Sequence, residues 1–122
     1  MLKNRRDENY LNVLIQYCDK IESTIGRLNY DKNNFIRDYD FQQSICFSLS
    51  QIGETVNKLS GEFKNEYNKV PWNAIKGMRN MIVHEYGIIN LNTVWETAIS
   101  DIVELKKYCI DIQNQIQKED LE

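Results

Sequence analysis

The sequence predicts an all-α protein that folds as an antiparallel bundle of four main helices. Three observations support this prediction: apolar residues recur every three or four positions, one proline and five glycines interrupt 122 residues, and no hairpin-like alternation of apolar and polar residues is found. The composition, 42% hydrophobic and 27% charged, is typical of a folded domain. At this length we expect residues 1–122 to form a single domain.

Two long helices are expected at about residues 7–28 and 40–59, separated by turn-prone residues 29–34. Their apolar stripes are Leu11, Leu14, Ile15, Cys18, Ile21, Ile25 and Leu28 in the first and Phe41, Ile45, Leu49, Ile52, Val56 and Leu59 in the second. Asp40, with Gln43 three residues on, is expected to cap the second helix, and Ser60-Gly61 to end it. Gly53 lies within the second stripe, where its missing side chain permits close approach of a neighbour.

A short third helix is expected from Trp72 to Tyr86, because Pro71 suits a helix start and Gly87 a helix end. A long fourth helix is expected at about residues 93–118, begun by a capping box of Thr93 and Glu96. Its apolar seam is Ala98, Ile102, Leu105, Cys109, Ile112 and Ile116. Such a seam packs within one bundle or contributes to a dimer.

The formal net charge of −3 argues against a protein that coats nucleic acid by bulk positive charge, but leaves room for a nuclease with one local RNA site. Residues 58–79 are locally basic, with five basic residues against two acidic ones. Cys18, Cys46 and Cys109 are far apart and are expected to be buried thiols, with no metal site and no cofactor. We expect a cytoplasmic protein without a membrane segment, because no stretch of roughly 18 apolar residues occurs.

His84 is the only histidine, and histidine alone has an unperturbed pKa near neutrality. It is therefore the first candidate for acid–base catalysis. The alternative is a structural role, because a histidine in the last turn of a helix interacts favourably with the negative end of the helix dipole. On a helix, Asn80 and His84 share a face, and Arg79 and Tyr86 lie nearly in line. Together these residues span roughly 160°. So wide a band fits a groove contacted from both sides, as at a two-fold dimer interface.

This set of residues suits cleavage of RNA. One imidazole would take the proton of the ribose 2′-hydroxyl, and another would protonate the leaving 5′-oxygen. Arg79 offers a planar fork of donors that matches phosphate oxygens. Because the 2′-hydroxyl is an internal nucleophile, this chemistry needs no metal.

The run from Val70 to Tyr86 resembles the motif region of HepT-like proteins of the HEPN superfamily, whose motif is Arg, four residues, His, one residue, Tyr. Arg79, His84 and Tyr86 match it position by position. Two further segments resemble the family, at residues 52–54 (Ile-Gly-Glu) and 94–97 (Val-Trp-Glu-Thr).

The resemblance implies an all-α homodimer whose motif residues meet at a cleft between subunits. It implies a metal-independent endoribonuclease that is the toxin of a toxin–antitoxin pair, with Arg79 and His84 catalytic. It also implies a minimal nucleotidyltransferase antitoxin that silences the toxin by AMPylation, transferring AMP from ATP onto Tyr86.

Several roles stay open. Asn80 is expected either to orient the substrate or His84, or to hydrogen-bond at the interface. Glu54 is expected to hold Arg79 or His84, or to be a buried carboxylate paired with any nearby cation. Trp72 and Trp95 are expected as core anchors rather than base-stacking platforms.

Two other functions compete with the nuclease: a catalytically silent HEPN module that binds a nucleotide or the nucleotidyltransferase, and an adaptor dimer that only docks partners.

Overall fold

The computed structural model describes residues 5–79 and 90–121 and shows an all-α architecture, with no strand in those residues. Three long helical segments form the bundle: α1 (Arg5–Arg27), α3 (Tyr39–Lys58) and α8 (Ile102–Asp120). Short elements connect them: α2 (Lys32–Arg37), α4 (Gly61–Glu66), α5 (Trp72–Lys76), the 3₁₀ turn η1 (Gly77–Arg79), α7 (Leu91–Glu96) and the π-helical turn η2 (Thr97–Asp101). None of the described helices is long and apolar enough to cross a membrane.

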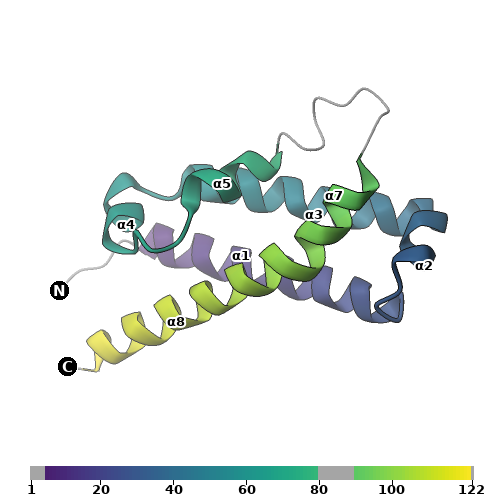
Figure 1. The fold of residues 1–122 in the computed structure, drawn as a ribbon. Helices are drawn as coiled ribbons and strands as arrows, with labels where there is room; N and C mark the ends of the chain where they lie inside the picture. The colour runs from purple at the N-terminus through teal and green to yellow at the C-terminus, as the bar shows by residue number, and fades with distance from the viewer. Residues whose placement is uncertain (1–4, 80–89, 122) are drawn as a thin grey trace.

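The long helices run up and down the bundle. α1 and α3 are antiparallel neighbours, and α8 runs back across α1, so that the start of α1 and the end of α8 lie at the same end of the molecule (Figure 1). The elements α5 and η1 lie along α3 (Figure 1). The predicted bundle architecture is confirmed.

The predicted apolar stripes form the core. Leu14, Leu49 and Cys109 are fully buried, and every member of the three stripes is buried except Ile15 and Phe41, which are partly buried against the core. The three cysteines are free and buried, as expected. Burial raises the pKa of the Cys18 thiol to about 12.

The two predicted helix caps were wrong by two and three residues. Asp38, not Asp40, caps α3, because its Oδ1 accepts a hydrogen bond from the Phe41 amide at 3.0 Å. Asn90, not Thr93, caps α7, because its side chain accepts from the Thr93 amide at 3.1 Å. In both cases a capping side chain just upstream of the predicted cap supplies the bond.

Two short helices occupy segments that were predicted to be turns. Asp31 caps α2 by accepting from the Asn33 amide at 2.8 Å, and Phe35 anchors that helix in the core against Trp95, with ring centroids 5.4 Å apart. Ser60 does not simply end α3. Its hydroxyl accepts from the Phe63 amide and so starts α4, while the buried Asp7 accepts from both the amide and the hydroxyl of Ser60. These local bonds compensate for the small apolar surface that each short helix buries.

Trp72 begins α5 as predicted, with Pro71 at the N-cap. After Lys76 the helix tightens into the 3₁₀ turn η1, which ends at Arg79. The remainder of the predicted third helix, including Asn80, His84 and Tyr86, lies outside the described residues.

Candidate functional site

Arg79 and Glu54 come together where η1 lies on α3. The Arg79 Nη1 atom is 3.5 Å from Glu54 Oε1, so the two side chains form an ion pair. The Arg79 side chain is 33% exposed and that of Glu54 is 45% exposed. An ion pair this open adds only about 0–1 kcal/mol to stability. The pair therefore contributes little to holding the fold together, but it places a carboxylate beside the guanidinium.

The partner of Glu54 in the described residues is Arg79, one of the two cations expected for it. Glu54 is half-exposed rather than buried, and its role in the site stays a prediction. A guanidinium has five N–H donors, and one contact with a carboxylate leaves others free. Because a third of the Arg79 side chain is exposed, those donors are accessible to a phosphate group.

Gly53 makes the approach of η1 to α3 possible. A Cβ atom at this position would lie 2.7 Å from the Arg79 amide nitrogen and 2.9 Å from the Lys76 carbonyl oxygen. Real Cβ atoms essentially never come so close to backbone atoms. The expectation that Gly53 admits a close neighbour is therefore confirmed, and the neighbour is the turn that carries Arg79.

Further cations lie near this junction. The pKa of Lys64 on α4 is lowered, first by partial burial and then by the positive charge of Lys76 on α5. Lys76 is thus close enough to Lys64 to affect its pKa, and Lys76 is three residues before Arg79. The locally basic stretch seen in the sequence is therefore partly gathered in space.

The two tryptophans are core anchors, as expected. Trp72 is buried and donates from Nε1 to the Tyr67 carbonyl oxygen at 3.0 Å, and Trp95 is buried against Phe35. In the described part of the chain, no three His, Cys, Asp or Glu side chains gather as a possible metal site.

The structure brings together two of the predicted site residues, Arg79 and Glu54. The other predicted site residues follow within seven positions of Arg79: Asn80, His84 and Tyr86. They are not among the described residues, so their place in the site stays a prediction. The sequence did not predict the contact between Gly53 and the Arg79 backbone. A glycine within a helix indicates that a neighbour can come close, but not which segment that neighbour is.

Comparison with known proteins assigns the chain to a family. Residues 14–112 match the family described as ribonuclease HepT-like, and the chain belongs to this family. The protein named "Putative RNase TTE0752" from Caldanaerobacter subterraneus subsp. tengcongensis is 34% identical over 110 residues, which cover 90% of this chain and 94% of that protein. "Putative RNase MJ1216" from Methanocaldococcus jannaschii is 30% identical, covering 91% and 90% of the two chains.

A third relative carries the family's name. "Probable ribonuclease HepT" from Thermococcus cleftensis is 26% identical over 102 residues, covering 84% of this chain and 91% of that protein. No solved structure matches the chain significantly. The resemblance noted in the motif region therefore extends over most of the chain.

Replacing Gly53 by alanine should destabilise the fold by about 1–3 kcal/mol, because the new Cβ forces η1 away from α3. Urea unfolding followed by circular dichroism measures the change. Gly26 in α1 is the matched control, since a Cβ there meets nothing within 4 Å and alanine favours a helix by up to about 1 kcal/mol. Equal stability of the two variants would contradict a close contact at Gly53.

Proposed function

We propose that this protein is a metal-independent endoribonuclease with Arg79 and His84 as its catalytic residues, and that it is the toxin of a toxin–antitoxin pair. The observation that supports the proposal most is the position of Arg79. Gly53 lets the Arg79 backbone lie against α3, and the guanidinium pairs with Glu54 while a third of the side chain stays exposed, in a chain of the ribonuclease HepT-like family. Three relatives are named as ribonucleases, which agrees with RNA as the substrate.

The proposed reaction is an internal transfer at phosphorus. His84 removes the proton of a ribose 2′-hydroxyl, and that oxygen forms a bond to the adjacent phosphorus. The bond from phosphorus to the 5′-oxygen breaks, and a second imidazole, the partner subunit's His84, supplies the proton to that oxygen. The products are a 2′,3′-cyclic phosphate and a free 5′-hydroxyl. Arg79 stabilises the negative charge that gathers on the phosphate oxygens.

A homodimer would supply the second imidazole. Phe47 on α3 offers an anchor for such an interface, because it is 58% exposed and packs edge-on against Tyr17 of α1. Phe47 and Glu54 are seven residues apart on one helix and therefore share a face. An interface along this face of α3 would continue from the aromatic pair to the Arg79 ion pair, and exposed aromatic residues are enriched at such interfaces.

Silencing is proposed to act on Tyr86. A nucleotidyltransferase partner would use the Tyr86 hydroxyl to attack the α-phosphate of ATP, releasing pyrophosphate and leaving AMP on the tyrosine. The bulky anionic group would then compete with RNA phosphate for Arg79. Asn80 is proposed to orient the substrate or His84.

Purified protein should cut RNA in the presence of a chelator, and His84→Ala and Arg79→Ala should each reduce the rate by about 10²-fold or more. Gel analysis of a labelled RNA measures both rates, and the 2′,3′-cyclic ends identify the reaction. Lys118→Ala, far from the junction of α3 and η1 at the end of α8, is the control and should cut normally. If the unmodified wild-type protein cuts no RNA, the catalytically silent HEPN module becomes the better description.

Tyr86→Phe should abolish incorporation of labelled AMP by the partner nucleotidyltransferase, because phenylalanine has no hydroxyl to attack ATP. Tyr39→Phe is the matched control, since Tyr39 is 68% exposed and its loss should leave labelling intact. Labelling that persists in Tyr86→Phe would reject this tyrosine as the modified residue.

Light scattering should report twice the chain mass of 14.5 kDa at micromolar concentration. Phe47→Glu should shift the protein toward monomer, because a charge would then have to be desolvated at the proposed interface. Ile36→Glu changes a residue on α2 that is also exposed, at 43%, and should leave the dimer intact. A monomeric wild-type protein would eliminate the two-subunit active site.

A further inference from the structure

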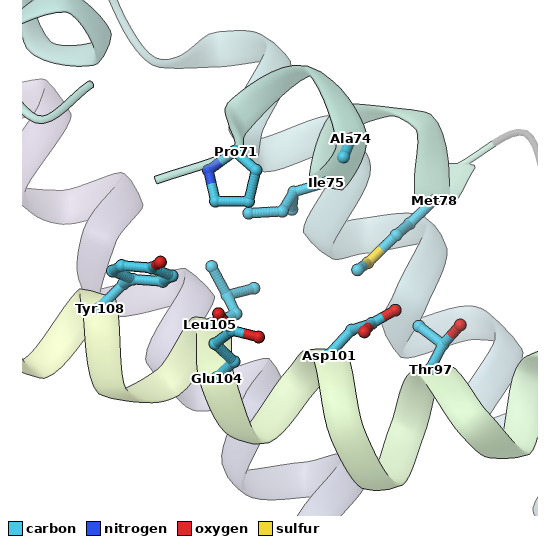
Figure 2. A pocket seen from close by; sticks show the side chains of 9 residues that line it. All are labelled: Pro71, Ala74, Ile75, Met78, Thr97, Asp101, Glu104, Leu105 and Tyr108. Carbon is cyan, nitrogen blue, oxygen red and sulfur yellow. The ribbon is translucent and has the colours of Figure 1, made fainter. Parts of the chain in front are cut away.

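A cavity of about 220 Å³ lies between α5 and η1 on one side and η2 and α8 on the other. Figure 2 shows it opening between two rows of side chains. Ile75 and Met78 contribute from the α5 side, and Leu105 and Tyr108 from α8. Its volume is smaller than the roughly 300–1,000 Å³ of pockets for drug-sized ligands. The cavity is therefore of a size for a small molecule with a short apolar body.

The floor of this cavity is apolar. Ile75, Met78 and Leu105 are 4%, 6% and 1% exposed, so a ligand that reaches them displaces water from the edges of side chains that already belong to the core. Such contact favours an apolar stem over a fully polar ligand.

The rim of the cavity is acidic. Asp101 and Glu104 are both exposed, and Figure 2 shows their side chains on the α8 side of the opening. They are three residues apart on a helix, a spacing at which like charges repel each other. Among the described residues neither carboxylate has an ion-pair partner. A bound cation would relieve the repulsion, whereas RNA phosphate would be repelled.

Tyr108 closes the end of the opening opposite Asp101 (Figure 2). The π-helical turn also lines the cavity. In that turn the Ile102 amide donates to the Thr97 carbonyl oxygen, five residues back, and both Thr97 and Asp101 border the cavity. Such turns are frequent at functional sites.

We propose that this cavity is a binding site for a small organic cation, with a guanidinium or ammonium head on a short apolar stem. The stem lies on Ile75, Met78 and Leu105, and the head lies at the carboxylates of Asp101 and Glu104. The site is separate from the proposed catalytic residues, yet it reaches the same turn, since Met78 directly precedes Arg79. A ligand here contacts η1 from the side of α8, while Gly53 contacts it from α3.

Butylguanidinium is a suitable probe, and pentanoate is its control with a similar stem and the opposite charge. Protein labelled with ¹³C at the methionine methyl groups gives at most three signals, one of them from Met78. Butylguanidinium should shift the Met78 signal in a saturable way, and pentanoate should not. The double variant Asp101→Asn with Glu104→Gln should raise the dissociation constant at least tenfold.

Glu96→Gln is the matched control variant, because Glu96 is an exposed carboxylate on the adjoining helix α7 that does not line the cavity. It should change the dissociation constant less than twofold. The proposal is overturned if butylguanidinium produces no saturable shift, if pentanoate binds equally well, or if the double variant binds like wild type. The measurement involves no RNA, so its outcome is independent of whether the protein cleaves RNA.

Discussion

The direct contact between the backbones of α3 and η1 at Gly53 determines where Arg79 lies. Because no side chain separates these two elements, the position of the arginine depends on α3 itself. α3 in turn packs along α1, with Ile45, Leu49 and Ile52 fully buried, and is capped by Asp38. The Arg79 backbone thus takes its place from a well-packed part of the bundle, and Glu54, one residue after Gly53, lies beside the guanidinium. A backbone that is fixed before a phosphate arrives leaves only the arginine side chain to be ordered on binding.

Much of the fold could be predicted from the sequence, because the three long stripes repeat over five turns or more and leave little doubt about which face is buried. The short elements could not. α2 buries one apolar residue, Phe35, so it has no periodicity to detect, and its existence depends on a cap at Asp31 and a tertiary contact with Trp95. The two wrong caps have a similar cause. Asp38 and Asp40 are both competent cap residues, and only the path of the chain between α2 and α3 selects the first.

For the candidate site, the sequence indicates which residues to consider but not their geometry. Arg79, His84 and Tyr86 stand out in the sequence because histidine occurs once and the spacing matches a family pattern. Glu54 and Arg79 are 25 positions apart in the sequence. Their pairing follows from the packing of η1 on α3, which cannot be predicted from a local sequence pattern. The cavity beneath Met78 could not be predicted either, because its two sides come from α5 and α8. In the sequence alone, its two carboxylates look like ordinary surface residues.

The π-helical turn at Thr97–Asp101 joins α7 to α8. A π turn holds one residue more than an α turn, and each residue of an α-helix advances the side chains by about 100°. Because the π turn accommodates its extra residue by widening, deleting one residue within it would restore a regular helix with little change of phase. The same deletion early in α8 would rotate α7 by about 100°, and Trp95 would then leave Phe35. Loss of one residue is therefore expected to be tolerated within this turn but not in the regular helix that follows it.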